Sequence, residues 1–169
     1  MELRSEQSKK YLAEALLDLM RKKAFSEIKI QEIVKRAGLS HMAYYRNFSC
    51  KEEILIYYLD AITDDFMARS SIRQYNNDFG LFIKILFVHL ISVKEIALLL
   101  YKNRLIHYVK EEFDRIMIQS AVTTEEKYRA YFISGGLYNI YYFWLINHCR
   151  ESADELAEYF MNFSYPHYP

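Results

Sequence analysis

The amino-acid sequence predicts an all-α protein, and three observations carry this prediction. Only 4 Gly and 2 Pro occur among 169 residues, which leaves little turn chemistry for a many-stranded sheet. Apolar residues recur at helical spacing, and no strand-like alternation is sustained. The chain is also 52% hydrophobic, which is ample for a core. We expect about nine helices, with a three-helix N-terminal domain over residues 1–51 and a larger helical domain over residues 52–169.

The first helix is expected over residues 8–23, where the apolar residues from Leu12 to Met20 share one face. Phe25 and Ile28 follow in a short connection. A second helix starts at Ile30 and should end at Gly38, a residue suited to the left-handed conformation that stops a helix.

Ser40 is a good N-cap for a third helix over residues 41–48. Two short helices joined by Ala37-Gly38-Leu39-Ser40 predict a helix-turn-helix, because glycine permits the sharp turn. In such a motif the second helix lies in a major groove of DNA. Tyr44 and Phe48 are expected to face inward. The outward side chains are suited to contact DNA. His41 and Met42 are expected to meet bases, and Tyr45 and Asn47 can donate to phosphate oxygens. Lys51 lies in the first turn of the next helix, where an anion is also favoured.

Ser49-Cys50-Lys51-Glu52 reads as a capping box that opens a fourth helix through Phe66. A polar stretch at residues 74–78 should then separate it from the rest. Further helices are expected at about residues 79–93, 94–101, 105–118, 124–148 and 153–163.

The net charge of zero conceals an uneven distribution. Residues 1–51 hold 11 Lys and Arg against 6 Asp and Glu, whereas residues 52–169 hold 11 against 16. A basic N-terminal third is expected of a segment that meets an anionic surface. An excess of this size can also arise by chance, so charge alone does not predict a nucleic-acid partner.

The stretch IQEIVKRAGLSHMAYYRNFSCKEEIL, preceded by KKAFSEIKI, resembles the DNA-binding domain of TetR/AcrR-type transcriptional regulators over about residues 8–55. Two departures affect the helix-turn-helix: Lys29 stands where Thr often caps the second helix, and Asn47 where His is frequent. Ala43 also offers a methyl in place of a frequent Thr hydroxyl. The resemblance implies that eight residues face DNA: Gln31, Ser40, His41, Met42, Ala43, Tyr45, Asn47 and Lys51.

The stretch YRAYFISGGLYNIYYFWLINHCRESADELAEYF resembles the end of a regulator subgroup common in Firmicutes. The resemblance implies a homodimer in which the last two helices of each subunit form a four-helix bundle. Gly135 and Gly136 lie inside a helix, where close helix approach would offset their cost of about 1 kcal/mol each. The expected interface residues form two stripes: Ile133, Leu137, Ile140 and Trp144, and then Leu156, Phe160 and Phe163.

The aromatic residues of the larger domain allow two interpretations. They could line a cavity for a small apolar or aromatic effector, or they could be core and dimer interface. The candidate pocket residues are Phe82, Phe87, Tyr101, Tyr108 and Tyr138. No pair of His or Cys falls at metal-binding helical spacing, and no catalytic motif is visible. We therefore expect no metal, no cofactor and no enzymatic activity.

Residues 130–149 lack charged side chains and are long enough to span a bilayer. They also contain Ser134, Asn139, Asn147, His148 and four tyrosines, which favours a soluble protein that does not enter a membrane. Cys50 and Cys149 lie too far apart in sequence to suggest a disulfide framework, and the N-terminus lacks a signal-like apolar stretch. The expected compartment is the cytoplasm.

The leading hypothesis is a homodimeric, ligand-responsive repressor that binds a palindromic operator in double-stranded DNA. A DNA-binding activator would show the same residues. The alternative from another class is a regulator-like protein-interaction module, an adaptor or co-activator without strong DNA binding. If Lys51 contacts a phosphate, Lys51→Ala should weaken binding and reduce the salt slope by roughly 1.

Overall fold

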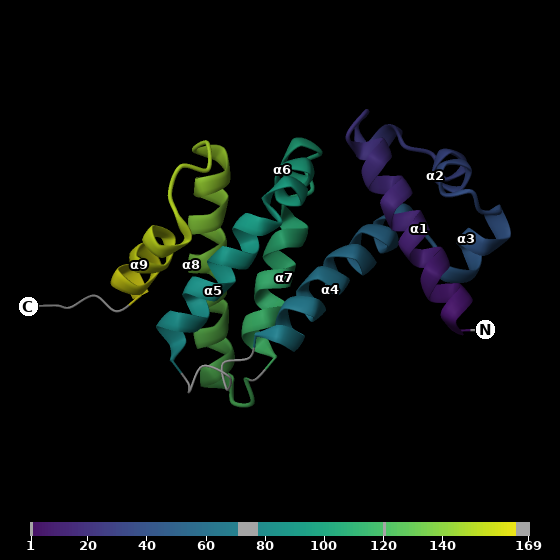
Figure 1. Ribbon diagram of the computed structural model, residues 1–169. Coiled ribbons are helices and arrows are strands. Elements are labelled where there is room, and N and C mark those ends of the chain that lie inside the picture. Colours follow the sequence, from purple (N-terminus) through teal and green to yellow (C-terminus); the bar gives the residue numbers. More distant parts are fainter. Residues whose placement is uncertain (1, 71–77, 120, 165–169) are drawn as a thin grey trace, which may run out of the picture. The chain divides into compact units, whose positions relative to one another are not determined.

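The computed structural model describes residues 2–70, 78–119 and 121–164 of the chain (Figure 1). Over these residues it contains nine α-helices, one short 3-10 turn and no strand, which confirms the predicted all-α class. The chain forms two compact units, Met1–Ile62 and Thr63–Pro169, which divide within one helix.

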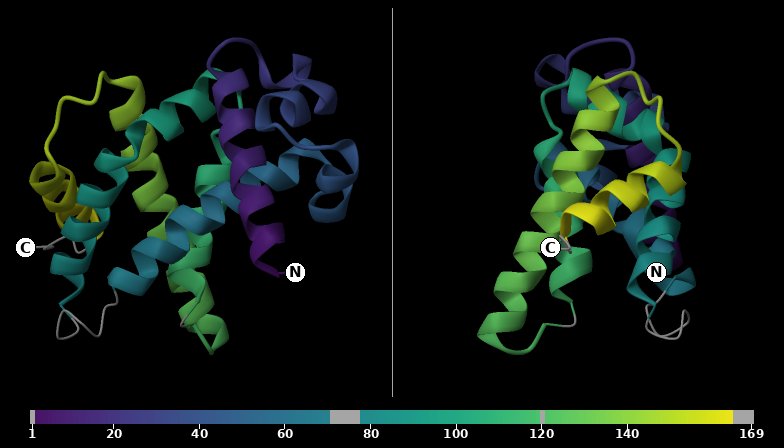
Figure 2. Two further views of the ribbon diagram at one scale, coloured as in Figure 1. Left: turned by 45° about the vertical axis from the view of Figure 1, so that its right-hand side comes forward. Right: turned by 90° about the vertical axis from the view of Figure 1, so that its left-hand side faces the viewer.

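The N-terminal unit places two short helices beside a long one, as the left view of Figure 2 shows. Its core contains residues with an exposed fraction of 0 or 1%, among them Leu12, Leu16 and Ile33. The predicted apolar face of the first helix is therefore confirmed, and its burial is the main force that holds the unit together. The elements are α1 (Glu2–Met20), the 3-10 turn η1 (Phe25–Glu27), α2 (Ile30–Ala37), α3 (His41–Asn47) and the first part of α4 (Lys51–Arg69).

The first part of α4 packs into the N-terminal unit. The hydroxyl of Tyr57 donates to the carboxylate of Glu6 on α1, and its ring meets that of Phe48 edge-on at 5.8 Å. The ammonium of Lys9 lies 5.4 Å from the centre of the same ring. These contacts, together with buried Ile54, explain why the units divide after Ile62 rather than after Lys51, where the sequence pattern suggested a boundary.

The C-terminal unit is an antiparallel arrangement in which α7 packs along α8, and α9 packs on α5 and α8. The predicted polar stretch at residues 74–78 lies outside the described residues except for Asp78, whose carboxylate accepts from the Leu81 N–H at 3.0 Å and caps α5. The helices are α5 (Phe79–Ser92), α6 (Lys94–Lys102), α7 (His107–Ile118), α8 (Thr124–Ile146) and α9 (Ala153–Ser164).

Two capping boxes start the last two helices, close to where the sequence predicts these helices to begin. The Glu126 carboxylate accepts from the Thr123 N–H at 2.8 Å, and the Thr123 hydroxyl accepts from the Glu126 N–H at 3.2 Å. Ser152 and Glu155 repeat this exchange at 2.8 and 3.3 Å. Backbone donors lower the pKa of both carboxyl groups. At α4 the pattern shifts, because the Ser49 N–H donates to Glu53 rather than to Glu52.

The uncharged stretch of α8 is not a candidate membrane span. Within the part of the chain that the structure describes, no helix combines the length and the hydropathy needed to cross a bilayer.

Candidate nucleic-acid interface

The turn between α2 and α3 depends on Gly38. Its φ of +67° lies in the left-handed region, where a side chain would be strained. The Leu39 N–H then donates to the carbonyl of Val34 at 3.0 Å, which closes the C-terminus of α2. Two residues later the Ser40 hydroxyl accepts from the Ala43 N–H at 3.1 Å and caps α3. The predicted helix-turn-helix is thus present, with its predicted stop and cap.

α2 begins without a threonine N-cap, and a different side chain satisfies a free backbone donor there. The Glu32 carboxylate accepts from the Lys29 backbone N–H at 3.0 Å, so the acidic residue alone satisfies one free donor. The same carboxylate pairs with the Lys23 ammonium at 2.7 Å. The Lys23 hydrogen bond, followed by the Lys29 backbone bond, lowers the pKa of Glu32. The Lys29 side chain itself is exposed.

The orientation of α3 is set by its inward residues. Tyr44 and Phe48 are buried, as predicted. Met42 and Arg46 each lie about 200° around the helix from Tyr44, so they form the line farthest from the domain. Both are exposed, and the exposed fraction of Met42 reaches 80%.

The predicted DNA-facing residues fall into two groups in the structure. Tyr45 is 61% exposed, and Ala43 is half-buried. Gln31, Ser40 and His41 are exposed. We call Ser40, His41, Met42, Ala43 and Tyr45 the α3 face, and Gln31 on α2 is exposed as well. Asn47 and Lys51 form the second group, because their side chains have partners inside the unit.

Asn47 connects two helices. Its amide nitrogen donates to the carbonyl of Ala43 at 2.6 Å, and its amide oxygen accepts from the Ser5 hydroxyl on α1. The sequence pattern suggested that this amide donates to a phosphate oxygen. In the structure its polar atoms hold α3 against α1 instead.

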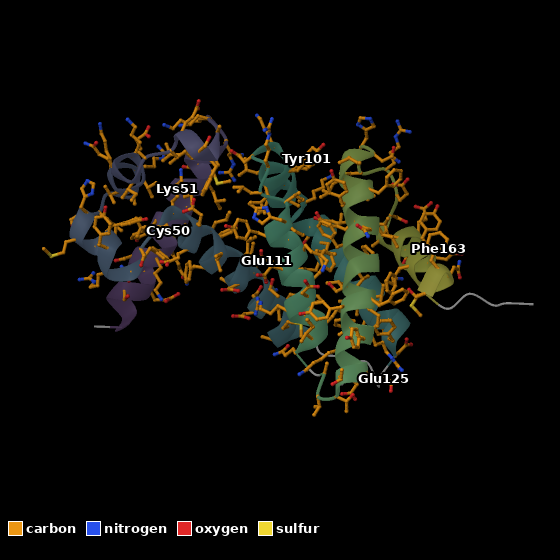
Figure 3. All side chains as sticks on the ribbon, turned by 180° about the vertical axis from the view of Figure 1, so that it is seen from behind. Cys50, Lys51, Tyr101, Glu111, Glu125 and Phe163 are labelled. Atoms are coloured by element: carbon orange, nitrogen blue, oxygen red, sulfur yellow. The ribbon has the colours of Figure 1, made fainter. Side chains whose placement is uncertain are left out.

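Lys51 also differs from expectation. Its ammonium donates to the carbonyls of Phe25, Ile28 and Ser26 at 2.6, 3.0 and 3.4 Å. It also lies 4.5 Å from the centre of the Phe25 ring. Figure 3 marks Lys51 at the start of α4. An ammonium has three donors, so a phosphate contact by this side chain would require the loss of at least one of these bonds.

Pattern reasoning missed Arg46 as a candidate contact. Several basic residues of the unit are neutralised nearby, since Arg21 and Arg36 both pair with Asp18. Lys35 and Arg46 are exposed and form no ion pair with the described residues. A helical projection from Tyr44 would have placed Arg46 on the outward line beside Met42.

A second surface lies on the C-terminal unit. Large apolar side chains on α8 face solvent, and we call Tyr128, Phe132, Phe143 and Ile146 the α8 stripe. Beside it is a cavity of about 530 Å³ between α8 and α9. Figure 3 marks Phe163 on α9, one of its lining residues. The lining residues are Tyr131, Phe132, Gly135, Gly136, Asn139, Ile140, Phe160, Phe163 and Ser164.

Four predicted interface residues are instead buried inside the unit: Leu137, Trp144, Leu156 and Phe160. Their stripes meet within one chain because α9 folds back onto α8. The Trp144 N–H donates to the carbonyl of Glu151 at 2.9 Å, for example. Of the other three, Ile133 and Ile140 are half-buried and Phe163 is exposed. On α8 the buried pair is Leu137 and Trp144, and on α9 it is Leu156 and Phe160.

The predicted pocket residues do not line this cavity. Phe82 and Phe87 are buried in the core. Tyr101 and Tyr138 each lie 5.9 Å from Tyr142, ring centre to ring centre. Tyr108 packs against the ring of His107. The structure brings Tyr101 and Tyr138 together around the Tyr142 ring. Nor do the described residues contain a cluster of three His, Cys, Asp or Glu side chains that could hold a metal.

Two short helices joined by a turn at a glycine pack on a third helix, and the α3 face is exposed. This arrangement defines a helix-turn-helix DNA-binding domain. Residues 12–58 match the family model described as bacterial regulatory proteins, tetR family. This match supports a TetR-family, DNA-binding transcriptional regulator. No curated protein matches the chain.

Proposed function

We propose that the chain is a homodimeric, ligand-responsive repressor that binds a palindromic operator in the cytoplasm. The observation that carries this proposal is the α3 face, which is exposed on a helix of fixed orientation within a tetR-type domain. The first turn of such a helix lies against base edges, and its flanks lie against phosphates.

The two groups of residues have different roles in this proposal. Base and phosphate contacts come from Gln31, Ser40, His41, Met42, Ala43 and Tyr45. Asn47 and Lys51 act through the fold, because their polar atoms already hold α3 and α4 in place. Direct phosphate contact by the Lys51 side chain is therefore not part of the proposal.

The second copy of the chain covers the α8 stripe. Phe132 is 70% exposed and Phe143 62%, which is a large apolar surface to leave in water. A Cβ built on Gly135 would have no neighbour within 4 Å, so an aromatic side chain from a second copy has room there. A two-fold axis along α8 would pair each stripe with its copy. Ile133, Ile140 and Phe163 are the predicted interface residues that are not buried inside the subunit.

The repressor would respond to a small apolar or aromatic effector bound by the C-terminal unit. Such a ligand can act only by binding one arrangement of the two DNA-binding units more tightly than another. Two such units in a dimer would contact half-sites about 34–36 Å apart, or a multiple of that distance.

Selection from a random duplex pool tests the proposal. Recovery of a palindrome by the full chain, with binding that weakens steeply as salt rises, is the expected result. A matched control is the double variant His41→Ala/Tyr45→Ala, whose side chains are exposed and should not alter folding. It should recover no common sequence. Failure of the unmodified chain to enrich any duplex at low salt would contradict DNA binding.

A protein-interaction module is the second candidate. It is favoured by one observation, namely that the Asn47 amide and the Lys51 ammonium both donate to carbonyls inside the unit. The pool selection separates this adaptor from a regulator. A DNA-binding activator would give the same palindrome, and only the effect on transcription would distinguish it from a repressor.

A further inference from the structure

Met42 is the most outward residue of the first turn of α3. Its side chain is 80% exposed, and it lies on the side of the helix away from buried Tyr44. The cap from Ser40 to the Ala43 N–H fixes the backbone on which it stands. Met42 therefore projects from a fixed turn, at the part of the helix that meets base edges.

The chemistry of this side chain restricts what it can recognise. A thioether donates no hydrogen bond and is only a weak acceptor, so it cannot pair with the donors and acceptors of base edges. The one apolar feature in the major groove is the C5-methyl group of thymine. The unbranched, flexible side chain of Met42 also adapts to an apolar contact more easily than a branched side chain does.

We infer that Met42 reads a thymine methyl group, so that each operator half-site contains an A·T pair at a fixed position. This inference rests on the proposed function and names the sequence class that the site accepts. Ala43 is next to Met42 and adds a second methyl to the same turn, with no hydroxyl to favour a polar base edge. Arg46 lies one turn further along the outward line and serves as a charged comparison.

The experiment uses the duplex recovered from the pool and replaces each thymine in turn by deoxyuridine. This change removes one methyl group and leaves base pairing intact. The full chain should bind the duplex about fourfold more weakly at the contacted thymine in each half-site, as one buried methyl predicts. The other thymines should tolerate the replacement.

Two variants identify the residue responsible. Met42→Ala should bind the thymine and deoxyuridine duplexes equally well at the contacted position, because the contact is already lost. Arg46→Ala should weaken both duplexes and keep the roughly fourfold ratio. Both side chains are exposed, so thermal unfolding of each variant should match that of the unmodified chain.

Three outcomes overturn the inference. If the unmodified chain tolerates deoxyuridine at every position, no thymine methyl is read, although DNA binding stands. If Met42→Ala keeps the unmodified ratio, another residue reads the methyl. If no duplex is recovered at all, both the inference and the proposed function fail.

Discussion

The ammonium of Lys51 lies 2.6 Å from the carbonyl oxygen of Phe25. Further bonds to Ser26 and Ile28 fasten the first turn of α4 to the segment that precedes α2. That segment contains the three-residue η1 and the buried side chains of Phe25 and Ile28. Lys51 thus holds the entrance of the helix-turn-helix on the rest of the unit.

Lys51→Ala should therefore lower stability and leave the salt slope of DNA binding unchanged. The variant leaves three carbonyls without this donor, which should cost about 1–3 kcal/mol of unfolding free energy. Urea unfolding measures the first effect, and binding at several salt concentrations measures the second. Lys35→Ala is the control for stability, because Lys35 is exposed and lies outside these bonds. A slope reduced by about 1 with unchanged stability would restore the phosphate role.

Tyr44→Phe should be neutral or stabilising, by up to about 1 kcal/mol. The Tyr44 hydroxyl is buried and has no hydrogen-bond partner among the described residues. Removing it relieves a desolvation penalty and keeps the ring that packs at 6.4 Å from Phe48, centre to centre. Thermal unfolding would show it, with exposed Tyr45→Phe as the matched control. A clear loss of stability would mean that the hydroxyl has a partner.

Stability should fall as the solution becomes alkaline. Burial raises the pKa of Tyr44 to about 12, and burial with the Glu6 hydrogen bond raises that of Tyr57 to about 12. An unfolded tyrosine ionises near pH 10. These groups therefore contribute stability that is complete below about pH 10 and is lost as pH rises toward 12. Urea midpoints at increasing pH would show the decline, and Tyr44→Phe should make it shallower. If the urea midpoint falls equally steeply with pH in Tyr44→Phe, Tyr44 does not contribute to the loss of stability.

Phe132→Ser should yield a folded monomer. The side chain is 70% exposed, so the subunit loses little packing, whereas a dimer covering the α8 stripe loses an aromatic contact. Sedimentation analysis gives the mass, and circular dichroism confirms that the helices persist. Val88→Ser is a matched control, because Val88 is an exposed apolar residue on α5. A dimer that survives in Phe132→Ser at low concentration would place the interface elsewhere.

The two adjacent glycines of α8 should respond differently to alanine. At Gly135 the added methyl meets nothing within 4 Å, so Gly135→Ala should stabilise the subunit by about 1 kcal/mol through helix propensity. It should also weaken self-association by filling the cavity. At Gly136 the methyl would lie 3.2 Å from the Phe160 ring, which offsets that gain. Thermal unfolding measures the stability of each variant, and mass measures its self-association. Equal changes in Gly135→Ala and Gly136→Ala would contradict the expected difference between the two positions.

The helix-turn-helix could be predicted because its determinants are local. Gly38 stops a helix and Ser40 caps one by interactions within a few residues, which are visible in the sequence itself. The same holds for the Thr123 and Ser152 capping boxes. Helical periodicity also predicts that Tyr44 faces inward, because the spacing of residues in the sequence determines on which side of a helix each one lies.

Long-range partners could not be predicted in this way. The Lys51 ammonium finds carbonyls 23 to 26 positions away in sequence, and Asn47 finds Ser5. Likewise, the apolar stripes of α8 and α9 are real, but spacing does not reveal whether their partner is the same chain. Phe160 packs on Gly136 of its own subunit, and a different line of α8 is left in solvent.

Trp144 is the single tryptophan of the sequence, and it is buried at the joint between α8 and α9. Its ring stacks on Tyr141 at 5.6 Å, and its N–H is held by the Glu151 carbonyl. Tryptophan emission therefore reports on the C-terminal unit alone, while the backbone signal reports on both units. If the two signals change at different denaturant concentrations, the halves of this protein unfold separately, and each can be measured without cutting the chain.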